Sequence, residues 1–322
     1  MITAIGNPVF DLIKTQKVDT QERILSGCST NAVLALNKLG EKTRLIGAIG
    51  PDFRERFESD MAARGIESVI IDSEISGGFS LHYYDDFGNR TLDLLGKAAD
   101  ITDIKPEWYT DSKAVLIGPI LGEVSFDEIA AIRRNFDGLF FCDPQGLLRG
   151  VDADGRITHT APAGIKECLA NFDIVKPNEL EGQVLTGLDC RKQPHQAAKI
   201  IHSWGPKIVF LTLAELGAVI YDGTDFVDVP PDTIKLPADI PAYAVNLLDS
   251  TGAGDTSMAG FTLEYLRTKD IVKSACFAGA TSSIMIENVG PDFEMTETMV
   301  RARAEKLYAQ IENGWRLETV GA

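Results

Sequence analysis

Short apolar runs alternate with amphipathic segments along most of the chain. The apolar runs have the length of buried strands, and they are MITAIG, TRLIGAIG, KAVLIGP, GLFFCD, FDIVKP and PKIVFLTL. Helix-like segments lie between them, and several begin with Ser, Asp or Asn and end at Gly, as capped helices do; these are STNAVLALNKLG, DFRERFESDMAARG, SFDEIAAIRRNF, NELEGQVLTG and PHQAAKIIHSWG. Strands that alternate with helices predict an α/β fold, with a parallel sheet and helices on both of its faces.

Two regions interrupt this alternation. Residues 10–27 are polar and mixed, without helix periodicity, and residues 78–96 hold two β-rich runs around Asp-Asp-Phe-Gly-Asn, which is a hairpin signal. Both are insertions between early elements of the sheet. Together they predict a small β-layer beside the main domain; the alternative is that they are two ordinary surface loops.

The pattern changes again after residue 251, where it predicts three successive helices over 252–267, 270–286 and 295–313. The chain has 322 residues, of which 44% are hydrophobic, so it can bury one large core. It contains no internal repeat and no long linker. We therefore expect a single domain that spans residues 1–322.

Charge and cysteine content exclude several classes of protein. The formal net charge is −16 and the isoelectric point is about 4.7, which does not suit a nucleic-acid binder, and no feature suggests a membrane surface. The five cysteines are scattered and form no C-x-x-C motif, as expected of reduced thiols. The chain opens without a basic segment before an apolar stretch, so we expect a cytoplasmic protein without a signal peptide.

A run of small residues carries the clearest chemistry. In DSTGAGDTSMAGF (249–261), Gly252-Ala253-Gly254 lies between a predicted strand, YAVNLLD, and a predicted helix. The first amide N–H groups of a helix have no intrahelical partner, and small residues let an anion approach them. Asp255 would then lie beside the anion, where it can take a proton from a nucleophile that attacks a phosphate. The alternative is that Asp255 only caps the helix.

The same string resembles the C-terminal signature of the PfkB/ribokinase family of small-molecule kinases, Asp-[Thr/Ser]-x-Gly-Ala-Gly-Asp. The resemblance implies a doubly wound α/β/α sandwich with a small β-sheet lid, which residues 10–27 and 78–96 would form. It also implies that Gly252, Ala253 and Gly254 form the anion hole for the transferred phosphoryl group, and that Asp255 is the general base. Asp249 and Thr251 lie where some members of the family hold a monovalent cation such as K⁺.

A second motif is VKPNELEGQVLTG (175–187), which is similar to the N-x-x-E motif of the family, with Asn178 and Glu181. In the family these residues organise Mg²⁺ and the phosphates of ATP, largely through water. Mg²⁺ prefers oxygen ligands and keeps several waters, so the residue types suit that role. The alternative is purely structural, with Asn178 as the N-cap of a helix and Glu181 as its capping-box partner.

Further matches place both substrates. On the acceptor side, SGCSTNAVLALNKLG (26–40) resembles the N-terminal glycine signature and keeps Gly27 and Asn31, whereas Ser26 replaces a usual Gly; Asp11 matches the early substrate-binding aspartate. On the nucleotide side, VFLTLAELGAVIYD keeps Thr212 and Gly217, with Ala214 in place of a usual Gly. Asn288, in FAGATSSIMIENVGP, would reach the base or ribose of the nucleotide.

Residues near the middle of the chain bear on the identity of the acceptor. Asp143, Gln145 and Arg149 follow a predicted strand in FFCDPQGLLR, and Glu123 follows another in LIGPILGEV. This arrangement looks like members of the family that act on cyclitols or related polyols, but Asp143 and Arg149 would equally well form a structural ion pair. His82, Tyr83 and Tyr84 would lie on the lid, and strand alternation sends only one of the two tyrosines inward.

The sequence therefore predicts an ATP-dependent kinase, with Mg²⁺, for an alcohol group of a small polyol, sugar or cyclitol. A nucleoside kinase on the same fold is the nearest alternative. A catalytically silent relative that only binds a metabolite is an alternative of another class, although Asp255 and the anion hole are intact. We also expect that two copies can pair through their lid sheets into a homodimer.

Overall fold

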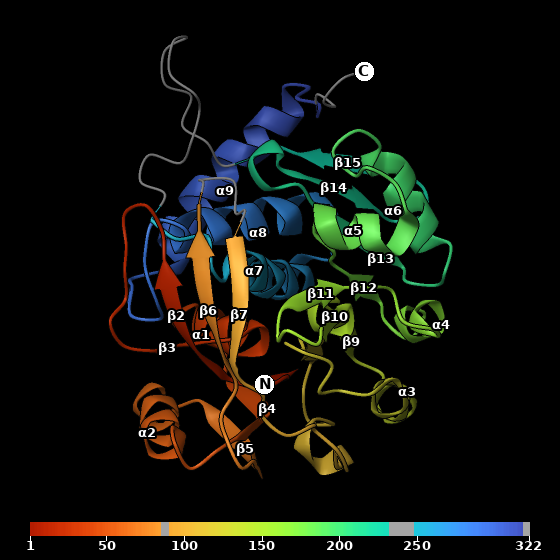
Figure 1. Ribbon diagram of the computed structural model, residues 1–322. Helices are drawn as coiled ribbons and strands as arrows, with labels where there is room; N and C mark the ends of the chain where they lie inside the picture. The colour runs from red at the N-terminus through yellow and green to blue at the C-terminus, as the bar shows by residue number, and fades with distance from the viewer. Residues whose placement is uncertain (85–89, 232–247, 318–322) are drawn as a thin grey trace.

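The computed structural model describes residues 1–84, 90–231 and 248–317 (Figure 1). Within these residues, a large sheet has the strand order β15-β14-β13-β12-β9-β8-β1-β4-β5. Its strands are β1 (Ile2–Ile5), β4 (Thr43–Ile49), β5 (Glu67–Asp72), β8 (Ala114–Ile117), β9 (Leu139–Cys142), β12 (Ile174–Val175), β13 (Ile208–Thr212), β14 (Ala218–Tyr221) and β15 (Phe226–Val229). The seven neighbouring strands β13, β12, β9, β8, β1, β4 and β5 are parallel to one another, whereas β14 pairs antiparallel with both β13 and β15. The six apolar runs all form strands, as predicted.

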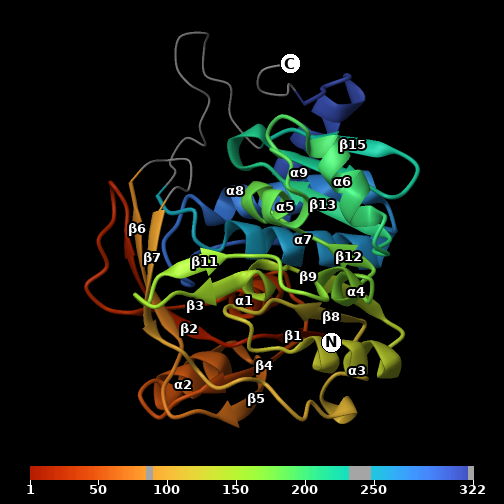
Figure 2. The ribbon, with the colours of Figure 1, turned by 45° about the vertical axis from the view of Figure 1, so that its right-hand side comes forward.

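Both faces of this sheet are buried. In β8, Ala114 and Leu116 join the core on one face, while Val115 and Ile117 join the core on the other face. Figures 1 and 2 show the helices in two layers around the sheet. One layer holds α1 (Cys28–Lys38), α2 (Arg54–Arg64), α7 (Ala253–Thr268), α8 (Ile271–Met285) and α9 (Glu297–Glu312); the other holds α3 (Phe126–Asn135), α4 (Ile165–Leu169), α5 (Glu179–Thr186) and α6 (Pro194–His202).

The two insertions pair with each other, so the surface-loop alternative is wrong. The strands β2 (Val9–Lys14), β3 (Ile24–Ser26), β6 (Gly78–Tyr83) and β7 (Arg90–Gly96) form a small sheet of order β3-β2-β6-β7 beside the large one (Figure 2). We call it the small sheet. β6 and β7 are antiparallel, as a hairpin requires, and the predicted turn at 85–89 lies outside the described residues.

Two local features differ from the prediction or were not predicted. The strand predicted over 243–249 lies mostly outside the described residues, and Leu248 and Asp249 are not in a strand. The structure also has an antiparallel pair, β10 (Arg149–Val151) and β11 (Ile157–His159), which the sequence did not indicate. In contrast, the three C-terminal helices lie within one or two residues of their predicted bounds.

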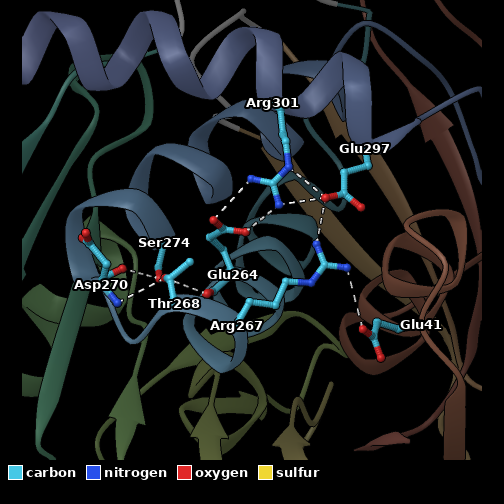
Figure 3. Close-up of polar contacts among 8 residues, drawn as sticks. All are labelled: Glu41, Glu264, Arg267, Thr268, Asp270, Ser274, Glu297 and Arg301. Atoms are coloured by element: carbon cyan, nitrogen blue, oxygen red, sulfur yellow. Dashed lines mark hydrogen bonds and ion pairs between the residues drawn. The ribbon is translucent and has the colours of Figure 1, made fainter.

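An ion-pair network holds α7 in place (Figure 3). The buried carboxylate of Glu264, on α7, accepts hydrogen bonds of 3.3 and 3.2 Å from Arg301 on α9. Arg301 also pairs with Glu297, which in turn accepts from Arg267 of α7 at 3.1 Å. Because a buried carboxylate needs a counter-charge and hydrogen bonds, Arg301 compensates Glu264, and the network links α7 to α9.

The cysteines agree with the expectation of reduced thiols. All five cysteines are buried free thiols. None of the helices within residues 1–84, 90–231 and 248–317 combines the length and the apolar character that a membrane span requires.

Candidate active site

A cavity of about 1000 Å³ lies where the carboxyl ends of the parallel strands meet the small sheet and the first turn of α7. The chain runs outward from β1 through β4 to β5, then returns to β8 and runs through β9 and β12 to β13. Ligands of doubly wound sheets bind beside such a reversal of strand order, at the carboxyl ends of the strands. Asp143 follows β9, Lys176 follows β12 and Thr212 ends β13, so the topology brings these side chains to one edge.

The glycine loop forms an open helix N-terminus. Gly252 is the N-cap of α7, with a φ of 83°, and a Cβ there would lie 2.9 Å from Asn31 Nδ2. No side chain caps the helix. Among the described residues, the amides of Gly252, Gly254 and Asp255 donate to no acceptor. These N–H groups, at the positive end of the helix dipole, are suited to bind an anion.

Asp255 lies at the floor of this cavity. Its Oδ2 atom accepts a hydrogen bond of 2.8 Å from Asn31 Nδ2, so it does not act as the cap of α7. One carboxylate oxygen of Asp255, one of Asp143 and the Sγ atom of Cys28 all lie within 4.8 Å of one another. Burial of the Asp255 carboxyl, followed by the nearby negative charge of Asp143, raises its pKa above the usual range, and Asn31 and Lys176 partly oppose this shift.

Lys176 is a site residue that the sequence did not indicate. It is 2% exposed, and its Nζ atom lies 2.7 Å from Asp143 Oδ2. Burial alone would lower the pKa of Lys176, but Asp143 and Glu181 more than reverse that effect, so the ammonium stays charged. The only sequence signal is its place directly after a buried strand, in Val-Lys-Pro-Asn.

The N-x-x-E motif forms the capping box that was considered as its alternative role. Asn178 Oδ1 accepts from the Glu181 amide, and Glu181 Oε2 accepts from the Asn178 amide, both at 2.9 Å. Both residues also line the cavity. Burial and the charge of Asp143 raise the pKa of the Glu181 carboxyl. The carboxylate retains free lone pairs, so these oxygen donors fit a hydrated Mg²⁺ as well as the cap.

Four of the predicted acceptor residues, Asp11, Gly27, Asp143 and Arg149, line the cavity, whereas Asn31 is not among the lining residues and instead donates to Asp255. Asp11 Oδ1 accepts a hydrogen bond of 2.8 Å from the Phe79 amide, which joins β2 to β6. Burial raises the pKa of Asp11 to about 7, although hydrogen bonds from Phe79 and Ser26 oppose the shift. Gly27, with a φ of 116°, begins α1, and its Cβ would lie 3.0 Å from the Asn7 carbonyl oxygen. Ser26, which replaces a usual Gly, favours the ionised form of Asp11 and so lowers its pKa.

The suggested ion pair between Asp143 and Arg149 does not form. Arg149 Nη2 donates to Gln145 Oε1 at 2.9 Å, whereas Asp143 pairs with Lys176. Arg149 lines the cavity, and its Nε atom is buried without a hydrogen-bond partner among the described residues. Glu123 has a structural role, because its carboxylate accepts from the amides at the turn 120–121.

The inward tyrosine of the small sheet is Tyr83. It is 3% exposed, and its hydroxyl lies 2.7 Å from Thr251 Oγ1, whereas Tyr84 is 59% exposed. Strand alternation therefore separates the two rings, as predicted. Thr251 Oγ1 donates its own proton to Asp249 Oδ1, so the Tyr83 hydroxyl must donate to Thr251. Asp249 Oδ2 is buried and has no hydrogen-bond partner among the described residues, which fits a nearby cation.

Three of the four predicted nucleotide residues, Asn178, Thr212 and Gly217, line the cavity, and Asn288 does not. Thr212 and Gly217 line the far end of the cavity, and Gly217 has a φ of 97° with no room for a Cβ, which would lie 2.1 Å from the Val229 carbonyl oxygen. Ala214 has a φ of 48°, a left-handed conformation that is strained for alanine. Asn288 donates to the Ile284 carbonyl and is not one of the cavity-lining residues, so the structure does not bring it to the site.

Comparison with known proteins decides the family. The chain matches the model of the pfkB family carbohydrate kinases over residues 1–299. This chain belongs to that family. It is therefore a carbohydrate or nucleoside kinase of the ribokinase type, a phosphotransferase that acts on a hydroxyl group.

Individual relatives differ in their substrates. The cytidine kinase of Thermococcus kodakarensis is 30% identical over 260 residues, which cover 76% of this chain and 80% of the relative. The nucleoside kinase of Methanothermobacter thermautotrophicus is 25% identical, with 92% and 93% covered. A solved pyrophosphate-dependent kinase in the ribokinase family is 25% identical, has a TM-score of 0.76, and covers 91% of this chain and 98% of its own. These relatives share the fold and the reaction class with this chain.

Proposed function

We propose that this kinase transfers the γ-phosphoryl group of ATP to a hydroxyl of a small polyol, sugar or cyclitol. The observation that carries the proposal is the placement of Asp255. Its carboxylate is held by Asn31 directly beside amides of the first turn of α7 that donate to no acceptor among the described residues. A general base and an anion hole on one helical turn is the arrangement that phosphoryl transfer to an alcohol requires.

The reaction follows from these positions. The acceptor hydroxyl gives its proton to Asp255 as its oxygen attacks the γ-phosphorus, and the bond from that phosphorus to the β,γ-bridging oxygen breaks, so that ADP leaves. The amides of Gly252, Gly254 and Asp255 and the helix dipole stabilise the negative charge on the phosphoryl oxygens, whereas the Ala253 amide donates to the Ser250 carbonyl. Asn178 and Glu181 would hold Mg²⁺ through water, and the ion would neutralise phosphate charge.

The far half of the cavity supports a nucleotide as the donor. It is lined by Phe210, Ala218, Val229, Ala275 and Gly279, which are apolar or small and leave room for a flat base. Pyrophosphate, the donor of one relative, needs no such surface. Thr212 and Gly217 would lie along the ribose and phosphates. Asp249 and Thr251 would form the K⁺ site that some members of the family have. Asp249 Oδ2, which has no hydrogen-bond partner among the described residues, would be a ligand of the ion.

The acceptor side of the cavity is polar. Asp11, Asp143, Gln145 and Arg149 line it, and they provide both donors and acceptors for several hydroxyl groups. Gly27 also lines the cavity. A nucleoside kinase is the second candidate, because the cytidine kinase and nucleoside kinase relatives share this chain over most of their lengths.

The purified protein tests this proposal directly. ADP release is measured with ATP, Mg²⁺ and a panel of polyols, cyclitols, sugars and nucleosides, with pyrophosphate in place of ATP as a parallel arm. We expect turnover with ATP and with at least one polyol, cyclitol or sugar. Turnover with nucleosides alone supports the second candidate, turnover with pyrophosphate alone contradicts the donor, and ATP binding without any turnover supports a silent relative.

A further inference from the structure

Lys176 lies inside the catalytic cavity, but none of the steps above uses it. Lysine is seldom fully buried unless it is paired, and this side chain is 2% exposed. Its partner is Asp143, at 2.7 Å, which itself lies beside the general base. The ammonium of Lys176 thus lies among the carboxylates of Asp143, Asp255 and Glu181.

The ammonium of Lys176 points at the anion hole. A Cβ on Gly254 would lie 3.2 Å from Lys176 Nζ, which is tighter than most such contacts, so glycine at this position leaves room for the ammonium. Gly254 belongs to the first turn of α7, and its amide and that of Asp255 have no acceptor among the described residues. Lys176 Nζ and these two amides therefore border the same space.

The hydrogen-bond count of Lys176 leaves donors for a ligand. An ammonium has three N–H groups, and in the described part of the chain Asp143 is the acceptor that pairs with it. Buried donors in native proteins usually have a partner. Two N–H groups of a buried ammonium that borders an anion hole are therefore available to an oxygen of a bound phosphoryl group.

We propose that Lys176 is a further catalytic residue, which binds a nonbridging oxygen of the phosphoryl group during its transfer. The proposal rests on the proposed function. Charge spreads over these oxygens in the transition state, and a fixed cation in a cavity with little water stabilises it without reorganisation. The positive charge of Lys176 also favours the ionised form of Asp255, against the repulsion from Asp143.

A simpler role must be separated from this one, namely that Lys176 only neutralises Asp143. Three variants make the distinction: Lys176→Met, Asp143→Asn, and the double variant that carries both changes. Lys176→Met leaves a buried carboxylate without its counter-ion and can destabilise the protein, but the double variant removes both charges. The effect of the lysine is therefore also measured in the Asp143→Asn background, where no ion pair remains.

Two readouts are used, of which one needs no acceptor. The first is kcat with the best acceptor, and the second is the affinity for inorganic phosphate with MgADP present, measured by calorimetry. A charge-assisted hydrogen bond corresponds to about a tenfold to hundredfold effect, so we expect Lys176→Met to lower both by that factor in either background. We expect the KM for the acceptor to change less than about threefold, because the contact forms to the phosphoryl group.

The proposal is overturned if Lys176→Met lowers kcat and phosphate affinity only in the protein that still has Asp143. If the double variant matches Asp143→Asn in kcat and in phosphate affinity, Lys176 is only a counter-ion. If the wild-type protein phosphorylates no acceptor, the proposed function fails instead. The phosphate titration then still decides whether Lys176 binds phosphate.

Discussion

The carboxylate of Asp255 lies in surroundings that make it a stronger base than an exposed aspartate. Asp255→Asn keeps the size of the side chain and an oxygen that can accept from Asn31, but it cannot take a proton. We expect kcat to fall by about 10²–10⁴, with ATP affinity little changed. Turnover within about threefold of the wild type would mean that Asp255 is not the base.

The pH dependence provides a second check on the same residue. Because burial and Asp143 raise the pKa of Asp255, the base is protonated at a higher pH than an exposed aspartate. We expect kcat/KM to rise with pH through this raised pKa and then level off. Profiles of the wild type and Asp255→Asn are compared, and the same acidic limb in both would assign it to another group.

Asp11 connects acceptor binding to stability. Its pKa is about 7 in the folded protein and 3.8 for the ordinary group, so its contribution to stability is fully present below pH 3.8 and is lost as pH rises through 7. Asp11→Asn should therefore gain thermal stability relative to the wild type as pH rises from 4 to 8. We expect the KM for the acceptor to rise about tenfold to hundredfold, from loss of a charged hydrogen bond.

Melting temperatures at pH 4 and pH 8 and acceptor kinetics test this prediction together. A variant that is less stable than the wild type at pH 8, with an unchanged KM, would show that Asp11 has only a structural role. If Asp11→Asn changed the KM for ATP instead of the KM for the acceptor, Asp11 would act on the nucleotide side of the cavity.

At the scale of single elements, the start of α5 combines a cap with a candidate metal site. Glu181→Gln can keep the capping box, because glutamine serves at the same position, but it removes a charge beside the expected Mg²⁺. We expect a higher Mg²⁺ concentration for half-maximal rate and a melting temperature close to that of the wild type. A clear loss of stability with the same Mg²⁺ curve would favour the purely structural role.

The small sheet contacts the catalytic loop through Tyr83. Its hydroxyl donates to Thr251, and Thr251 donates to Asp249, so the loop before α7 depends on the position of β6. Tyr83→Phe removes this link and keeps the ring. We expect kcat to fall by about twofold to tenfold, in line with the loss of one neutral hydrogen bond.

Steady-state kinetics with Tyr84→Phe as the matched control check this link. The control removes the hydroxyl of the adjacent ring, which is largely exposed. Equal rates for Tyr83→Phe, Tyr84→Phe and the wild type would show that the small sheet does not influence catalysis through Thr251.

Local patterns were sufficient to predict most elements but not every contact. Strands such as β8 were predictable because both faces are buried, which produces continuous apolar runs. The pair β10–β11 is short and only partly buried, so it has no comparable pattern. Lys176 was missed because a lysine after a strand is usually solvated, and its burial depends on Asp143, which lies far away in the sequence.

At the scale of the whole molecule, the order of the strands brings distant motifs into one site. Asp11 on β2 of the small sheet, Asp143 after β9 and Asp255 on the first turn of α7 belong to three separate parts of the chain, yet all three line the cavity at the carboxyl ends of the parallel strands. The family signature anticipated this convergence for Asp255 and Asp11, whereas the contact between Tyr83 and Thr251 could not be predicted. Pairing of two copies through the small sheet stays a prediction, which light scattering tests.

The central claim is that this chain moves the γ-phosphoryl group of ATP to an alcohol with Asp255 as the base. Its most direct test uses ATP labelled at the γ-phosphate, with the acceptor panel, Mg²⁺, and the wild-type and Asp255→Asn proteins side by side. The account predicts a labelled phosphate ester from the wild type, formed at least about a hundredfold more slowly by the variant. Labelled inorganic phosphate without any ester, or equal ester formation by both proteins, would contradict it.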